Sequence, residues 1–184
     1  AGLQHDDATE LRDARYEAGP SGIELPQAAG RILVVDDDAA VRRFVADALA
    51  GAGYDVQDVA SGWEARHALE HGSIALLLSE VSMPRETGLD LIRFTTSEHP
   101  TTATLLMSAL EDPGIAGAAM DLGAYGFLSK PVSRSAVLIG VMNALRRRDV
   151  EARERAERAK LERAVAVRTG ALSEALVRLE GAAK

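Results

Sequence analysis

Short apolar runs alternate with amphipathic stretches along most of this chain. Five runs rich in Val, Leu and Ile have the length of buried strands and cover residues 31–35, 54–59, 74–79, 102–108 and 125–128. The stretches between them place apolar residues at helical spacing. Strands and helices that alternate in this way predict an α/β protein with a doubly wound, five-stranded parallel sheet and right-handed crossovers.

Gly, Pro and capping residues bound the predicted helices. Four helices are expected at residues 39–51, 61–71, 89–97 and 112–122. Glu64 lies three residues after Ser61, which is the spacing of a capping box. The first of these helices gathers its apolar residues on one face, which consists of Val41, Phe44, Val45, Ala48 and Leu49.

The last helix, from Val132 onward, has no clear stop. Residues 143–180 contain no proline and only one glycine, Gly170. Counting Arg168, an apolar seam with alternating steps of three and four residues passes through Leu161, Val165, Leu172, Ala175 and Leu179. A weaker seam in another register passes through Leu145, Ala152, Ala156 and Ala159. Because such a helix cannot bury itself on a small domain, a parallel dimeric coiled coil is expected, with a frayed single helix as the alternative.

The pattern divides the chain into three parts. Residues 1–30 are expected to be an arm or linker in which 8–18 could form a helix, 31–147 a globular domain, and 148–184 a coiled-coil helix continuous with its last helix. That last helix carries more apolar residues than one core face needs, which predicts a dimer surface among Val137, Leu138, Ile139, Val141, Met142 and Leu145.

Composition and charge narrow the possible functions. Apolar residues make up 47 % of the 184 residues, so a core can form, and the absence of cysteine excludes disulfides and thiol chemistry. Residues 146–184 carry 11 Lys and Arg against 7 Asp and Glu, whereas residues 1–145 carry 10 against 21. The acidic part argues against nucleic-acid binding, and no apolar run has the length of a membrane helix. A chain that begins with Ala1 is expected to be processed or part of something longer.

Polar residues stand where four of the predicted strands end. They are Asp36, Asp37, Glu80, Ser108 and Lys130. Since the carboxyl ends of parallel strands share one edge of a sheet, these side chains are expected to line one pocket. Clustered carboxylates repel one another unless a cation intervenes, and Mg²⁺ suits such oxygen ligands. A cation, a lysine and a hydroxyl around one carboxylate can stabilise a transferring phosphoryl group.

Several sequence blocks resemble the receiver domain of two-component response regulators. They are Val34-Val35-Asp36-Asp37, Met83-Pro84 with Gly88, Met107-Ser108-Ala109 and Gly126-Phe127-Leu128-Ser129-Lys130-Pro131. The resemblance covers about residues 31–147 and implies a flavodoxin-like fold. It further implies that Asp36 and Asp37 hold Mg²⁺ with the backbone carbonyl of Ser82 and the acceptor position, that Ser108 and Phe127 are the switch pair, and that Lys130 contacts the phosphoryl group.

The chain departs from the family at Glu80, which occupies the position of the phospho-accepting aspartate. The additional methylene moves the carboxylate by roughly 1.5 Å, and a misplacement of about 1 Å can cost on the order of 100-fold in rate. We therefore predict that Glu80 is a poor acceptor and biases the switch towards its active form. The alternatives are an inert scaffold and residual phosphorylation. A natural replacement and a deliberate substitution fit the sequence equally.

Rival interpretations remain for individual motifs. Asp36 and Asp37 could simply cap a helix, although Asp38 is better placed for that role. His67 and His71 have chelating spacing, but a solvated helix face is the simpler interpretation. A haloacid-dehalogenase-like phosphatase would also use Asp and Mg²⁺, yet the chain has no room for the cap domain it needs. A purely structural dimerisation module is a further alternative.

The resemblance implies a signalling role without enzymatic activity. A sensor histidine kinase is the expected phosphoryl donor, and an output domain outside this sequence is the expected target. The expected assembly is a homodimer through the last helix and the coiled coil. A cytoplasmic location is expected, without direct contact with membrane or nucleic acid.

Overall fold

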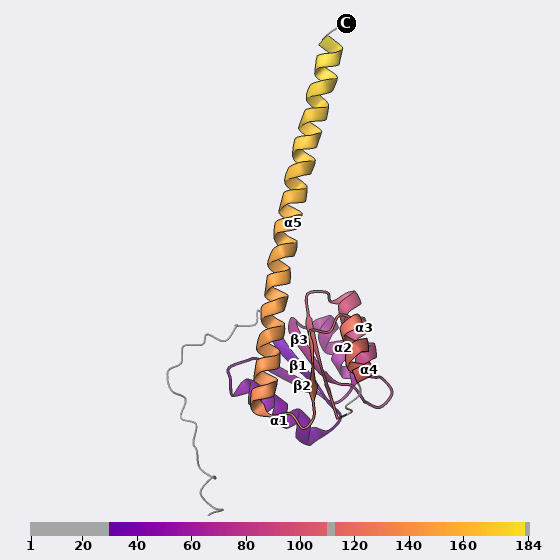
Figure 1. Cartoon of the computed structure of the whole chain (residues 1–184), viewed down its shortest axis with the longest axis vertical. Helices are drawn as coiled ribbons and strands as arrows, with labels where there is room; N and C mark the ends of the chain where they lie inside the picture. Colours follow the sequence, from indigo (N-terminus) through magenta and orange to yellow (C-terminus); the bar gives the residue numbers. More distant parts are fainter. Residues whose placement is uncertain (1–29, 110–112, 183–184) are drawn as a thin grey trace, which may run out of the picture.

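The computed structural model of the protein describes residues 30–109 and 113–182. Its sheet is formed by β1 (Arg31–Val35), β2 (Val56–Val59), β3 (Ile74–Glu80), β4 (Ala103–Ser108) and β5 (Gly126–Ser129). All neighbouring strands pair in parallel in the order β2-β1-β3-β4-β5. The predicted fold is thus confirmed (Figure 1). The predicted arm at residues 1–30, apart from Gly30, and its possible helix lie outside the described residues.

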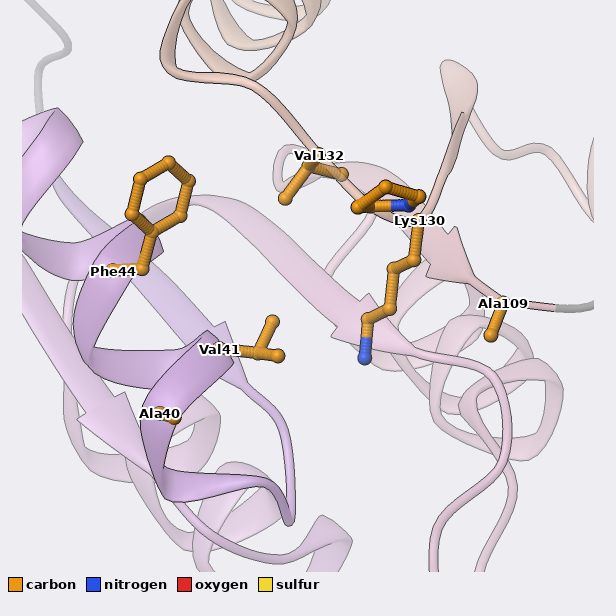
Figure 2. A pocket seen from close by; sticks show the side chains of 7 residues that line it. Ala40, Val41, Phe44, Ala109, Lys130 and Val132 are labelled. Carbon is orange, nitrogen blue, oxygen red and sulfur yellow. The ribbon is translucent and has the colours of Figure 1, made fainter.

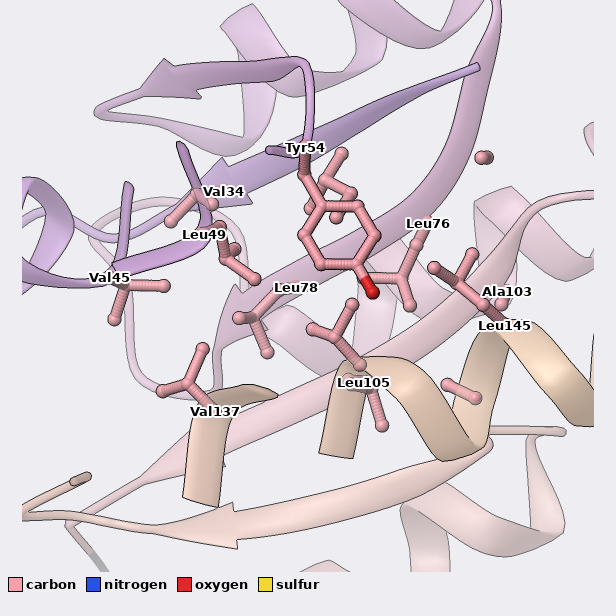
Figure 3. Close-up of a cluster of buried hydrophobic side chains, with 14 of the residues drawn as sticks. Val34, Val45, Leu49, Tyr54, Leu76, Leu78, Ala103, Leu105, Val137 and Leu145 are labelled. Carbon is pink, nitrogen blue, oxygen red and sulfur yellow. The ribbon is translucent and has the colours of Figure 1, made fainter. Parts of the chain in front are cut away.

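Helices cover both faces of the sheet. They are α1 (Ala39–Ala50), α2 (Gly62–His71), α3 (Gly88–Glu98), α4 (Pro113–Asp121) and α5 (Arg134–Ala182). On one face, α1 and α5 bury Val45, Leu49, Val137 and Val141 against the strands (Figure 3). On the other, α2, α3 and α4 pack against alternate strand residues such as Leu33 and Leu77. Both faces are therefore closed, as the continuous apolar strands require.

Side-chain caps fix where the first three helices begin. Asp38 accepts hydrogen bonds from the amides of Ala40 and Val41, which hold the pKa of its carboxyl below the usual value. Ser61 caps α2 by accepting from the Glu64 amide. Thr87 and Asp90 form a reciprocal capping box at the start of α3. The elements that follow β1, β2 and β3 therefore begin at positions dictated by local sequence.

Phe44 differs from the other apolar residues on the same face of α1. It is 45 % exposed. Val45, Ala48 and Leu49 are buried, whereas Val41 is only partly buried. Helical periodicity gave the correct apolar face, but the sheet covers only the part of this face that contains Val45, Ala48 and Leu49. Phe44 lies beyond that part and is left accessible.

Helix α5 is one continuous element of 49 residues. Val137, Val141 and Leu145 are buried in the core, while Ile139 is mostly exposed. From residue 152 to residue 170 every side chain is exposed, and the helix runs well beyond the sheet and the other helices (Figure 1). The side chains of Ala175 and Leu179 lie outside the described residues. No helix in the described part of the chain could cross a membrane.

Polar contacts extend the attachment of α5 beyond its buried residues. The Tyr125 hydroxyl donates a hydrogen bond to the Glu151 carboxylate, and Arg147 lies over the Tyr125 ring, 4.9 Å from its centroid. Arg148 donates to the Thr101 carbonyl at 2.8 Å, and Arg155 to the Pro100 carbonyl at 3.2 Å. Two loops of the globular part therefore hold the next two turns of the helix. We call this set of contacts the α5 anchor.

Candidate functional site

Three neighbouring strands and the end of β5 bring the predicted site residues together. Asp36 follows β1, Glu80 ends β3, Ser108 ends β4 and Lys130 follows β5. With Asp37, Asp38, Ser82 and Ala109 they line a hollow of about 290 Å³ at the carboxyl edge of the sheet. The convergence expected from the sequence is therefore present. The roles of these residues in binding and signalling stay predictions.

Asp36 is fully buried and held from three directions. Its Oδ1 accepts a hydrogen bond from the Asp38 amide at 2.9 Å, and its Oδ2 pairs with Lys130 Nζ at 2.7 Å. Its carbonyl accepts from Arg42 Nη1 at 2.6 Å. A buried carboxylate needs such partners, because its removal from water is otherwise strongly unfavourable. Arg42 is thus part of the support of the site, although no pattern in the sequence singles it out.

Glu80 is 5 % exposed, and its carboxylate turns back onto the loop that follows β3. Oε1 accepts from the amides of Val81 at 2.9 Å and Ser82 at 3.1 Å. Oε2 forms an ion pair with Lys130. Both carboxylate oxygens are therefore engaged by groups of the chain itself.

Lys130 connects the two buried acids. Its ammonium contacts Oδ2 of Asp36 and Oε2 of Glu80. Burial alone lowers the pKa of Lys130, but the hydrogen bonds and the charges of Asp36 and Glu80 outweigh burial and raise it above the usual value. The site therefore contains a fixed positive charge between two negative ones.

The loop after β3 is held tightly against the strand. The Gly88 amide donates to the Val81 carbonyl at 2.8 Å, and a Cβ on Gly88 would lie 2.2 Å from the Glu80 carbonyl oxygen. Arg85 adopts a φ of 72°, a left-handed backbone conformation that residues other than glycine rarely adopt. Only a glycine at position 88 lets the loop return this closely to Glu80.

Carboxylate oxygens of the predicted Mg²⁺ site suit a hard cation, but their arrangement does not. Asp36 and Glu80 each give an oxygen to Lys130, and Asp37 lines the hollow as an exposed residue. Across residues 30–109 and 113–182, no three acidic or histidine side chains lie close enough to share a metal ion. As placed, these residues do not fit a divalent ion, and the lysine ammonium supplies the neutralising charge instead.

The two predicted switch residues lie on adjacent strands. Ser108 is buried at the end of β4, and its carbonyl accepts a hydrogen bond from the Lys130 amide at 2.7 Å. Phe127 on β5 is half-buried and packs against a cluster that includes Val81 and Leu106. Phe127 therefore contacts the segment that follows Glu80 through apolar neighbours.

An apolar hollow of about 420 Å³ lies beside Lys130. It lies between α1 and the segment after β5, and its lining residues are Ala40, Val41, Phe44, Ala109, Lys130, Pro131 and Val132. Figure 2 shows Val41 and Phe44 of α1 opposite Lys130 and Val132. The exposed Phe44 thus belongs to a depression next to the polar site.

The two histidines of α2 stay apart from this site. The rings of His67 and His71 stack with centroids 4.3 Å apart on the exposed face of the helix. His71 Nδ1 lies 2.9 Å from the His67 carbonyl oxygen. Since the described part of the chain offers them no third ligand, they form a solvated surface pair.

The family profile of the response regulator receiver domain matches residues 32–141, which is more than half of the chain. This chain belongs to the response regulator receiver family. Receiver domains serve phosphorelay signalling, typically bind Mg²⁺ for phosphorylation, and are generally not enzymes.

Relatives of this receiver include larger regulators. It is 36 % identical over 102 residues to the DNA-binding transcriptional regulator NtrC of Escherichia coli, covering 55 % of this chain and 22 % of NtrC. It is 32 % identical over 124 residues to the response regulator protein PilR of Pseudomonas aeruginosa, covering 67 % and 28 %. The receiver thus spans less than a third of the length of either relative.

Solved receivers share its architecture. A receiver domain from Clostridium thermocellum superimposes with a TM-score of 0.61 at 28 % identity, covering 66 % of this chain and 98 % of that one. The family profile covers residues 32–141, so the projecting part of α5 lies outside the matched region. The receiver fold therefore accounts for the globular part, and the long helix is an addition to it.

Proposed function

We propose that this chain is a receiver in which Glu80, at the phospho-acceptor position, replaces the phosphoryl group with a permanent negative charge and thereby favours pairing of the chain through α5. We assign residues 31–147 to the receiver, 148–184 to the pairing helix and 1–30 to an arm. The observation that carries the proposal is the Glu80 carboxylate, buried and bound by Lys130. Lys130 is the residue that the family resemblance assigns to the phosphoryl group.

The contacts of Glu80 also argue against its being an acceptor. An acceptor carboxylate needs one oxygen free to attack phosphorus, whereas both Glu80 oxygens are engaged by the loop amides and by Lys130. The longer side chain displaces the nucleophile as well, and nucleophilic steps are sensitive to such displacement. We therefore expect a sensor histidine kinase, the family's usual donor, to transfer little or no phosphate to this chain.

Acetyl phosphate tests this expectation directly. The chain and its Glu80→Asp variant are incubated with acetyl phosphate and Mg²⁺, and their intact masses are measured. We expect the mass of one phosphoryl group to be added to the Glu80→Asp variant and not to the chain itself. A gain on the unmodified chain that disappears in Glu80→Gln would show that Glu80 is phosphorylated, and the proposal would then be wrong.

The permanent-charge proposal is tested by the dimer affinity. Glu80→Gln keeps the length of the side chain and removes its charge, so it is the matched variant. We expect its dimer dissociation constant, measured by analytical ultracentrifugation, to be about tenfold higher than that of the unmodified chain, because a coupling of 1–3 kcal/mol is usual between linked sites. Glu80→Asp is expected to behave like Glu80→Gln until beryllofluoride, a phosphoryl mimic, restores pairing.

The second candidate is an inert dimerisation module. The observation that favours it is the closed network of Asp36, Lys130 and Glu80, in which the ammonium is already satisfied without any phosphoryl group. Equal dimer affinities for the unmodified chain, Glu80→Gln and Glu80→Asp with beryllofluoride would support this candidate over the switch.

Downstream of pairing, we propose that an output domain reads the arrangement of the paired helices. NtrC, named as a DNA-binding transcriptional regulator, is one relative in which a receiver occupies a small part of a longer protein. Mg²⁺ at Asp36, Asp37, Glu80 and the Ser82 carbonyl stays a prediction for this chain. Binding of Mg²⁺ would require the carboxylates of Asp36 and Glu80 to give up their ion pairs with Lys130. We therefore expect Mg²⁺ to bind more weakly to this chain than to its Glu80→Asp variant.

A further inference from the structure

Four large apolar side chains of α5 are exposed at a constant interval of eleven residues. They are Ile139, Val150, Leu161 and Leu172, and between 51 % and 65 % of each residue is exposed. Eleven residues make about three turns of an α-helix and return to within about 20° of the same direction. The four side chains therefore form one apolar line, the eleven-residue stripe, which turns by about 60° around the helix between Ile139 and Leu172. It starts on the receiver and continues along the part of α5 that projects from it.

The eleven-residue stripe faces away from the receiver. Arg148 and Arg155 of the α5 anchor reach receiver carbonyls, and Val141 on the same side of the helix is buried in the core. Val150 lies two residues after Arg148, which places it about 200° around the helix axis. A partner could therefore lie along the stripe without displacing the contacts that Arg148 and Arg155 make with receiver carbonyls.

The seven-residue seam that the sequence suggests upstream faces a different way. It begins at Leu145, which is buried in the core cluster and so is not available to a partner. Its next member, Ala152, lies only about 40° from the direction of Arg148. A helix packed on this seam would therefore collide with the receiver. Leu161 and Leu172 belong both to the stripe and to the downstream seam that begins at Leu161, so the stripe departs from the seams only in the upstream half of the helix.

We propose that the eleven-residue stripe is the surface on which a second copy of this chain pairs, parallel and in register. An identical helix carries the same interval, so each stripe residue meets its counterpart. Parallel pairing also brings the two copies of Ile139 together, whereas an antiparallel pair centred on Leu161 would leave them apart. An apolar repeat of eleven residues favours a right-handed or nearly straight pair. This inference rests on the proposed function for pairing itself and adds which face of the helix pairs.

Charged residues beside the stripe limit the strength of this pairing. Arg146, Glu157 and Arg168 also recur at intervals of eleven residues, and Glu157 lies about 40° from Leu161 around the helix. In a parallel pair in register, each meets a like charge, which opposes association. Charge repulsion therefore opposes the apolar attraction along the stripe, which leaves the pairing equilibrium open to influence from the receiver.

Cysteine cross-linking tests the face and the direction of pairing. The chain contains no cysteine, so single-cysteine variants of the full chain give an unambiguous readout. Under mild oxidation we expect Val150→Cys, Leu161→Cys and Leu172→Cys each to form disulfide-linked dimers, and Ala152→Cys to remain monomeric on a denaturing gel. If the Ala152→Cys variant cross-linked and the Val150→Cys variant did not, the chain would pair through another face of α5, and the stripe would be wrong as the pairing surface. Cross-linking of Val150→Cys to Leu172→Cys in a mixture, without either pairing with itself, would overturn the parallel direction.

Affinity measurements show whether pairing depends on the stripe residues or on any exposed apolar side chain of α5. Val167 is 73 % exposed on the same helix but lies off the stripe, so Val167→Ser is the matched control for Val150→Ser. We expect Val150→Ser to raise the dimer dissociation constant at least about tenfold and Val167→Ser to leave it within about twofold, since only the first loses buried apolar area. Equal effects would overturn the stripe. A chain that is monomeric at all concentrations would overturn the proposed pairing as well.

Discussion

Lys130 occupies a position where two buried carboxylates would otherwise repel each other. Asp36 is fully buried, Glu80 nearly so, and the ammonium contacts both. Attraction between partly buried charges is stronger than at the surface because the local dielectric constant is lower. The same burial makes the loss of one partner costly, since the remaining charges stay in a medium that solvates them poorly.

Replacing Lys130 by methionine should therefore destabilise the receiver strongly. We expect Lys130→Met to lower the free energy of unfolding by about 3 kcal/mol, measured by urea denaturation at neutral pH. Lys160→Met is the matched control, because Lys160 is exposed and its pair with Glu157 is 3.8 Å long, so its loss should cost less than about 0.5 kcal/mol. Mg²⁺ should raise the free energy of unfolding of Lys130→Met more than that of the unmodified chain, because in the variant the ion would not compete with the lysine ammonium for the carboxylates. Equal stability of both methionine variants would contradict the role of Lys130.

Gly88 is a residue whose absence of a side chain shapes the site. Gly88→Ala would place a Cβ 2.2 Å from the Glu80 carbonyl oxygen and 2.8 Å from Leu106 Cδ2. The backbone atom cannot move without disturbing β3, so we expect a loss of about 3 kcal/mol or more in the free energy of unfolding. Gly117→Ala is the control, since nothing lies within 4 Å of its Cβ, and it should stabilise α4 by about 0.5–1 kcal/mol. Similar losses for both variants would refute the close approach at Gly88.

At the scale of elements, a polar contact links the residue before β5 to α5 outside the core. Tyr125 immediately precedes β5, and its hydroxyl donates to Glu151 of α5. Burial and the nearby Glu151 carboxylate raise the pKa of Tyr125 to about 12, and this hydrogen bond holds the pKa of Glu151 below its usual value. The contact joins the strand that carries Phe127 to the helix that we propose to pair.

The raised pKa of Tyr125 predicts a loss of stability at high pH. An unfolded tyrosine loses its proton near pH 10, and the folded one near 12. Between these values the unfolded state holds fewer protons, so stability falls as pH rises, while below about pH 10 the contribution is complete. We expect thermal unfolding of the unmodified chain to shift downward over this range by more than that of Tyr125→Phe. Identical pH profiles for the two proteins would contradict the contact.

Local signals in the sequence predicted more of the fold than of the contacts. The strand positions, the Asp38 cap and the meeting of Asp36, Glu80 and Lys130 follow from residue patterns and from the parallel sheet. The capping box of Thr87 and Asp90 has a recognisable spacing and was missed. The Tyr125–Glu151 contact joins residues 26 apart, and no pattern along the chain encodes it. The return of the Glu80 carboxylate to its own loop likewise depends on backbone amides, which every residue except proline has.

At the scale of the whole molecule, a receiver of ordinary architecture carries a helix far longer than its domain can cover. Its buried part, the α5 anchor and the eleven-residue stripe lie on one uninterrupted element. The charge distribution also separates the projecting helix from the rest of the chain, because residues 1–145 carry a net negative charge and residues 146–184 a net positive one. The direction of the stripe could not be read from the sequence, since it depends on which side of α5 the receiver occupies.

Because the α5 anchor holds only one end of the projecting helix, a small tilt at the anchor is amplified at the far end. From Arg155, its last contact with a receiver carbonyl, to Ala182 the helix is about 40 Å long at 1.5 Å per residue. A tilt of about 5° at the anchor, which requires shifts of well under an ångström in the loops at Pro100 and Tyr125, would move the far end by about 3.5 Å. A rearrangement too small to disturb the core can thus become a displacement comparable to the size of a side chain.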